Sequence, residues 1–108
     1  MKVNFADIEE VMNEGFKGGD GVVGIKGHDW ENGRFLQGRV TPHSSIGQHV
    51  HDSNNEIMYI VKGTATFIYD GVEEIVHEGE CHYCPKDHGH TLINNTDEDV
   101  VFFAVLHN

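Results

Sequence analysis

Most of this chain carries the hydrophobic pattern of short β-strands. Apolar and β-branched residues alternate with polar ones or form short runs, and glycine, asparagine and aspartate separate the runs. The strands predicted from this pattern cover residues 22–26, 35–41, 56–61, 64–69, 72–76, 81–84, 91–93 and 100–106. About eight short strands joined by tight turns indicate an all-β barrel or jelly roll.

Two dipeptides mark the turns between these strands. Asn32-Gly33 and Asp70-Gly71 each separate two neighbouring strands of the pattern. Both dipeptides favour type I′ turns, because asparagine, aspartate and glycine tolerate positive φ. We therefore expect a β-hairpin at each place, and an antiparallel meander over residues 56–76.

Only the first residues have a helical pattern. Ile8, Val11 and Met12 recur at the spacing of one helix face, with Asp7 as a possible N-cap and Gly15 as a stop. We expect one short helix there. It would lie in an N-terminal extension of about residues 1–32, before a barrel of about residues 33–107.

Length and charge narrow the class of protein. The chain has 108 residues, enough for one domain, and 7 basic against 18 acidic residues give a formal charge of -11. With no basic run and no long apolar stretch, we expect neither nucleic acid nor a membrane as a partner. The first residues are acidic where a secretory signal would have an apolar core. The two cysteines are too few for a disulfide framework. We therefore expect a soluble cytoplasmic protein.

Histidine is the unusual component, with 9 in this short chain. His49 and His51 are one residue apart, so in an extended segment both rings point to the same side. Glu56 opens the next predicted strand, and closure of a barrel could bring His90 to the same place. Mixed imidazole and carboxylate ligation suits iron, manganese, nickel, zinc or copper, and hardly suits calcium.

The spacing of these residues resembles the two sequence motifs of the cupins. The first motif places an H-x-H pair before a glutamate and a glycine, and the second places a glycine and a proline before a histidine and an asparagine. The matching residues are His49, His51, Glu56, Gly63, Gly79, Pro85, His90 and Asn94. His43 and Asp87 stand where the motifs have glycine.

This resemblance implies a cupin-type double-stranded β-helix, a jelly-roll barrel, with one divalent transition metal. The implied ligands are His49, His51, Glu56 and His90. Small cupins include dioxygenases, isomerases, decarboxylases and lyases, and of these we favour a dioxygenase acting on a small organic molecule. His88 and Tyr83 would then be catalytic residues that handle protons. The alternative is a non-catalytic module that captures a small molecule or the metal, and in either case we expect a homodimer.

A second metal site is conceivable at Cys81 and Cys84, whose C-x-x-C spacing could form a structural zinc site with His88 and His90. In a strand, however, positions i and i+3 face opposite sides. We therefore expect one cysteine to be buried and the other to face outward.

Alternation also assigns the residues around the expected metal. Met58 and Ile60 share the parity of Glu56 and should line the cavity, whereas Tyr59 should face outward. His43 could lie at the cavity mouth. The other histidines outside the motifs, His28, His77 and His107, are expected at the surface or at strand ends.

Overall fold

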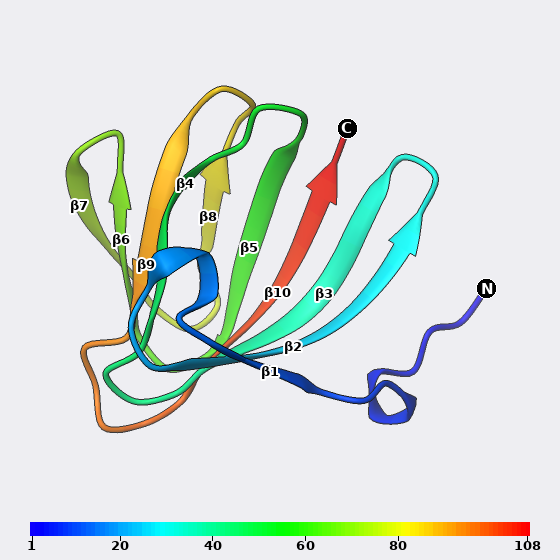
Figure 1. Cartoon of the computed structure of the whole chain (residues 1–108), viewed down its shortest axis with the longest axis horizontal. Coiled ribbons are helices and arrows are strands. Elements are labelled where there is room, and N and C mark those ends of the chain that lie inside the picture. Colours follow the sequence, from blue (N-terminus) through cyan, green and yellow to red (C-terminus); the bar gives the residue numbers. More distant parts are fainter.

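The computed structural model describes residues 1–108, which form two β-sheets packed around one core (Figure 1). The larger sheet has the strand order β1-β2-β3-β10-β5-β8, and the smaller has the order β4-β9-β6-β7. The strands are β1 (Val11–Glu14), β2 (Val22–Trp30), β3 (Gly33–Val40), β4 (Ser45–Val50), β5 (Asn55–Lys62), β6 (Ala65–Tyr69), β7 (Val72–Val76), β8 (Cys81–Cys84), β9 (Gly89–Ile93) and β10 (Val100–His107).

All strand pairs are antiparallel, and the predicted all-β fold is confirmed. The hairpins at Asn32-Gly33 and Asp70-Gly71 join β2 to β3 and β6 to β7, as their turn residues predict. The expected meander over residues 56–76 is wrong, because β5 and β6 lie in different sheets and do not pair. The C-terminal strand β10 lies between β3 and β5, so the last residues of the chain complete the middle of the larger sheet. Such long-range pairings fix where each strand's side chains point.

The two sheets do not close into a complete barrel, so the expectation of a closed barrel needs correction. They remain separate ladders, and the edge strands β8 and β7 share no backbone pairing. The larger sheet also begins well before residue 33, because β1 and β2 are paired members of it. The segment described above as an N-terminal extension therefore contributes strands to the fold.

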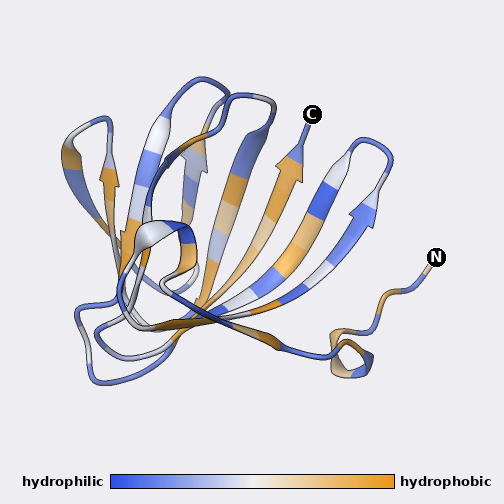
Figure 2. Ribbon diagram, in the orientation of Figure 1, coloured by the Kyte–Doolittle hydropathy of each residue, from blue (hydrophilic) through white to orange (hydrophobic).

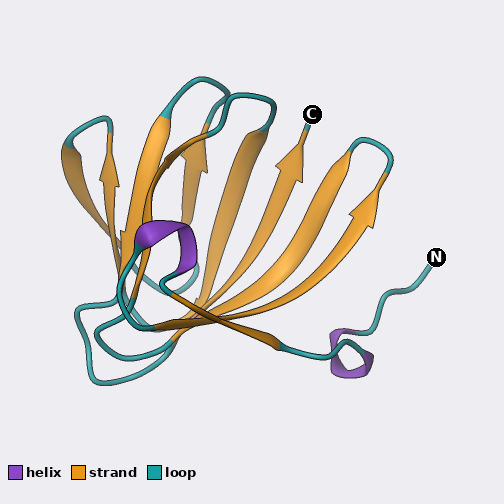
Figure 3. Ribbon diagram, in the orientation of Figure 1, coloured by secondary structure: helices purple, strands orange, loops and turns teal.

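The predicted N-terminal helix is wrong. Figure 3 shows only two short helical turns, the 3-10 turns η1 (Phe5–Asp7) and η2 (Phe16–Gly18). Val11 and Met12 instead pair with β2. Both side chains are exposed, so no hydrophobic core lies against them that an amphipathic helix could have packed on. Glu10 accepts two hydrogen bonds from Arg39 of β3, which hold this segment against the sheet. No helix in the structure has the length and apolar character needed to cross a bilayer.

The core lies between the sheets and is built by alternation. The buried hydrophobic residues come from the inward positions of both sheets, and Phe67 and Phe102 are the largest of them. Figure 2 shows the apolar positions along the strands and the polar ones in the turns. Burial of such side chains is the main contribution to the free energy of folding, at about 25 cal/mol per Å² of apolar surface.

The two motif positions that lack glycine keep the glycine conformation. His43 has φ 58° and Asp87 has φ 72°, and the motif glycines Gly63 and Gly79 also have positive φ. Left-handed backbone costs a residue with a β-carbon about 1 kcal/mol or more, so these two turns are strained. The turns of both motifs are therefore preserved although two of their glycines are not.

Asn94 holds the turn before β10 in place. Its side chain is fully buried, and its amide group donates to the carbonyl oxygens of Val40, Thr41 and Glu98. Its side-chain oxygen accepts hydrogen bonds from the backbone and hydroxyl of Thr96. One side chain thus satisfies polar groups of two separate segments inside the protein.

We expect Asn94→Ala to lower the free energy of unfolding by about 2 to 4 kcal/mol, because buried carbonyl groups lose their donors. The neighbouring Asn95→Ala is the control, because Asn95 is exposed and makes one long hydrogen bond of 3.4 Å to Thr66. Urea denaturation of both variants measures the difference. Equal unfolding midpoints for the two variants would contradict this role for Asn94.

Candidate metal site

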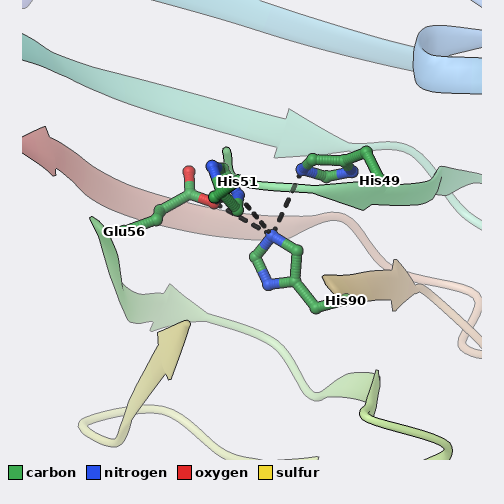
Figure 4. A group of neighbouring side chains, drawn as sticks. All are labelled: His49, His51, Glu56 and His90. Atoms are coloured by element: carbon green, nitrogen blue, oxygen red, sulfur yellow. Dashed lines mark hydrogen bonds and ion pairs between the residues drawn. The ribbon is translucent and has the colours of Figure 1, made fainter. Parts of the chain in front are cut away.

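Three histidines and one glutamate meet between the two sheets. His49 lies on β4, His51 directly follows that strand, Glu56 lies on β5 and His90 lies on β9. Figure 4 shows His90 at the centre, with the other three side chains turned toward it. One ligand atom from each residue lies within 4.8 Å of the others. The structure thus brings together all the residues named as ligands from the motifs.

A β-bulge in β4 gives His49 its direction. Ile46 pairs with Leu92 of β9 and His49 pairs with His90, so two residues of β4 between these pairs lie opposite one residue of β9. Residues three apart on a regular strand point to opposite faces, and the extra residue of the bulge reverses the second one. Ile46 and His49 therefore both line the interior, although their spacing alone would separate them.

The distances inside this His-Glu cluster are those of direct polar contacts. His90 Nε2 lies 2.9 Å from His51 Nε2, 3.2 Å from His49 Nε2 and 3.1 Å from Glu56 Oε1. The same glutamate oxygen lies 3.0 Å from His51 Nε2. His51, Glu56 and His90 are buried, and His49 is half-buried at the cavity wall.

The outer ring nitrogens show that the cluster suits a cation. His49 Nδ1 lies 2.8 Å from the carbonyl oxygen of Gly47, which can only accept a hydrogen bond, so this nitrogen is the donor. His51 Nδ1 has an equivalent acceptor, Asn54 Oδ1, at 2.8 Å. In a neutral ring the other nitrogen, Nε2, then carries a lone pair. Two such lone pairs and a carboxylate oxygen converge, which is the donor set of a divalent transition metal.

The pKa shifts of the cluster residues agree with this interpretation. Burial alone would raise the pKa of Glu56, but the hydrogen bond from His51 and the adjacent ring of His90 outweigh it and lower the pKa to about 2. The hydrogen bond to Glu56 raises the pKa of His51, against the opposing effect of burial. Burial lowers the pKa of His49. Glu56 is therefore ionised at neutral pH and needs a compensating positive charge beside it.

A cavity of about 600 Å³ opens directly onto the cluster. All four cluster residues line it, together with apolar side chains such as Met58, Leu92 and Phe102. Met58 therefore lies where its parity predicts. Ile60 is fully buried but lies in the core away from the cavity, and Tyr59 faces outward as expected. A mostly apolar cavity with a few polar groups at one end is typical of small-molecule sites.

The structure does not bring the two expected proton-handling residues to the cluster. Tyr83 is 54% exposed, because on β8 it has the opposite parity to the buried His82. His88 contacts Asp70 and Tyr69 instead, with 2.6 Å between His88 Nδ1 and Asp70 Oδ2. Neither residue lines the cavity, so a proton-handling role for them has no support from the cavity and stays a prediction from the sequence.

The C-x-x-C segment forms no second site. Cys81 is exposed and Cys84 is buried, as alternation predicts, so their sulfur atoms face opposite sides of β8. Burial raises the pKa of the Cys84 thiol to about 11, so it stays protonated at neutral pH. His43 is also away from the cluster, exposed and paired with Asp97 at 2.7 Å.

His82 is the contact of the cluster that sequence reasoning missed. It is buried, its Nε2 lies 3.0 Å from His90 Nδ1, and its Nδ1 lies 2.5 Å from Glu74 Oε1. Burial lowers the pKa of His82, so the ring is neutral at physiological pH. Its parity on β8, shared with the buried Cys84, was the available signal that it points inward.

Fold and site together define a two-sheet all-β protein with an interior three-histidine, one-glutamate cluster that can hold a metal ion. The sequence pattern of the cupin domain matches residues 36–106. The chain therefore belongs to the cupin family.

Comparison with individual proteins adds two relatives from Thermotoga maritima. Its oxalate-binding protein is 29% identical over 72 residues, which make up 67% of this chain and 60% of that protein, less than two thirds of its length. A crystal structure described as a predicted oxalate decarboxylase superposes with a TM-score of 0.93 at 26% identity, covering 99% of this chain and 98% of the other.

A more distant structure shows the shared fold alone. The sugar phosphate isomerase of the cupin superfamily from Silicibacter pomeroyi superposes with a TM-score of 0.83 at 18% identity. The superposition covers 100% of this chain and 76% of that one.

We expect Glu56→Gln to weaken binding of Mn²⁺ or Zn²⁺ at least about tenfold, because the substitution keeps the shape but removes the charge facing the imidazoles. Asp52→Asn is the matched control, since Asp52 lines the same cavity outside the cluster. Competition with a chromophoric chelator measures both affinities. Unchanged affinity in Glu56→Gln would show that the metal binds elsewhere.

Proposed function

We propose that this protein binds one divalent transition metal (iron, manganese, nickel, zinc or copper) through His49, His51, Glu56 and His90 and uses it to hold a small carboxylate anion. The convergence of these four side chains at one end of the cavity is the observation that carries the proposal. When bound, such a metal supplies positive charge and free coordination positions for ligand oxygens. The oxalate-binding relative supports a carboxylate as the ligand.

The charge balance of the cavity favours an anion. A divalent metal beside the single carboxylate of Glu56 leaves a net positive charge. Lys17 and Arg34 also line the cavity, and Arg34 is paired with Asp29 at 3.4 Å while Lys17 forms no ion pair. Lys17 is therefore the cationic side chain available to the second charge of a dicarboxylate.

The backbone holds Lys17 close to the cluster. A β-carbon at Gly47 would lie 2.1 Å from the carbonyl oxygen of Lys17, so η2 packs directly on the bulge of β4. Lys17 itself has φ 55°, a left-handed conformation that costs a non-glycine residue about 1 kcal/mol or more. Strained backbone persists where the surrounding structure determines it, often at ligand sites. The lysine is thus placed at the cavity by packing of its own main chain.

Capture of the ligand without turnover is the function that the cavity supports best. Apart from the cluster, its titratable lining residues are Glu9, Lys17, Arg34 and Asp52, and neither His88 nor Tyr83 is among them. A dioxygenase is the second candidate, because three histidines and one glutamate leave coordination positions of an octahedral metal free for substrate and dioxygen. The apolar lining of the cavity is compatible with both.

We expect oxalate to bind the metal-loaded protein and not the metal-free protein, because the metal supplies the positions for its oxygens. Lys17→Met should weaken this binding about threefold to thirtyfold while leaving metal affinity unchanged. Isothermal titration of both proteins measures the two affinities, with Lys2→Met as the control for loss of one positive charge.

Binding of oxalate without metal would contradict the proposal. Oxygen consumption on mixing the iron-loaded protein with small carboxylates or phenols would favour the dioxygenase over simple capture. Elemental analysis of protein purified without added metal identifies the ion.

We also propose that the protein is a homodimer. The outer face of β5 and β8 exposes the apolar side chains of Ile57, Tyr59, Val61 and Tyr83. Ile57 and Tyr83 are direct neighbours across the strands, so these side chains form one patch on the larger sheet. A contiguous apolar patch on a small protein is typical of a protein interface.

Light scattering coupled to size-exclusion chromatography should therefore give about twice the chain mass. Tyr59→Glu should shift the protein toward one chain mass, because it places a charge in the middle of the patch. A wild-type mass equal to one chain would refute the dimer.

A further inference from the structure

One ligand of the His-Glu cluster has an unusual partner on its outer side. The outer nitrogens of His49 and His51 each face an oxygen atom, a backbone carbonyl and a side-chain amide respectively. The outer nitrogen of His90, Nδ1, instead faces the buried imidazole of His82. An imidazole can donate or accept, so His82 alone would leave the tautomer of His90 open. The state of His82 therefore decides what His90 offers to a metal.

We propose that Glu74 and His82 form a positioning pair that fixes His90 in the tautomer whose Nε2 can bind the metal. Glu74 Oε1 lies beside His82 Nδ1, and a carboxylate can only accept, so this nitrogen carries the proton. In the neutral His82 ring Nε2 is then an acceptor, and His90 Nδ1, 3.0 Å away, must donate to it. His90 Nε2 is left with its lone pair toward the cluster, and the proton that faces Glu56 Oε1 is then that of His51 Nε2, 3.0 Å away.

Packing holds this pair in one orientation. The ring of His82 stacks on Phe67, with 3.9 Å between centroids and 17° between planes, and His82 is 2% exposed. His82 lies on β8 and Glu74 on β7, the neighbouring edge strands of the two sheets. The contact between His82 and Glu74 thus links β8 and β7 by side chains, although these strands share no backbone pairing.

This inference rests on the proposed metal binding, because a fixed tautomer matters only if His90 Nε2 is a ligand. Partners that orient a ligating histidine typically contribute tenfold to a hundredfold in metal affinity. Glu74 is 44% exposed at its side chain, so its substitution leaves the core intact. The pair therefore acts on the metal through His90 and not by direct contact.

Variants of the pair test the effect on affinity. His82→Phe keeps an aromatic ring against Phe67 but removes the acceptor, and should weaken Zn²⁺ binding about tenfold to a hundredfold in a chelator competition. His82→Gln keeps an acceptor oxygen in reach of His90 Nδ1 and should recover part of this loss. Glu74→Gln should weaken binding less than His82→Phe. Glu73→Gln is the matched control, since Glu73 precedes it on the exposed edge strand and has no contact with His82.

The tautomer itself is measurable without metal. In ¹⁵N-labelled metal-free protein at about pH 8, above the ordinary histidine range, long-range ¹⁵N–¹H spectra should show His90 protonated at Nδ1. In His82→Phe the His90 signals should shift toward a mixture of both tautomers, while amide spectra confirm that the variant is folded.

The outcomes separate the two proposals. If the wild-type protein binds no Zn²⁺ but His90 is protonated at Nδ1, the proposed function fails and the positioning pair stands as a property of the fold. If the wild type binds Zn²⁺ and folded His82→Phe binds it equally well, the pair has no positioning role. A wild-type His90 protonated at Nε2 would also overturn the inference.

Discussion

Convergence of ring nitrogens and one carboxylate oxygen in a small buried space is the constraint on which this structure depends. The outer nitrogens of His49 and His51 donate to oxygen atoms of Gly47 and Asn54. The outer nitrogen of His90 donates to His82, which in turn donates to Glu74. The inner ring nitrogens therefore present lone pairs to one another. Lone pairs at about 3 Å repel unless a cation or a proton lies among them. Without a metal, a proton shared with His51 lowers this repulsion, and a divalent ion balances it more completely.

The architecture around this cluster serves two purposes at once. The bulge in β4 turns His49 inward. Gly47, which lies in this bulge, has no side chain, so η2 packs close enough to bring Lys17 to the cavity. The contact between Glu74 on β7 and His82 on β8 lies on the side of the His90 ring that faces away from the cluster. Hydrogen bonds therefore hold the outer nitrogens of the cluster, and its inner atoms face a mostly apolar cavity. Rigid ligands facing an accessible cavity are what reversible capture of a small anion requires.

Membership of the cupin family fixes the fold more firmly than it fixes a reaction. Proteins that resemble this chain include ones named for oxalate binding and for isomerisation of a sugar phosphate, so a shared fold does not imply a shared chemistry. On a shared fold, the side chains that line the site decide what is bound. Here the lining combines apolar side chains with Lys17, which supports the proposed capture of a small anion.

The sequence by itself determined the central strands, the two hairpins and the four cluster residues, because alternation, Asn-Gly and Asp-Gly turns and motif spacing are local properties. Tertiary structure decided the rest. Pairing with β2 overrode the weak helical pattern around Val11, and the bulge that orients His49 exists only where β4 meets β9. Tyr83 and His88 were assigned by nearness in sequence, whereas His82 was found only by its contact with His90. Which side chains touch depends on strand register across the sheets, and register is a property of the folded pairings, not of any one segment.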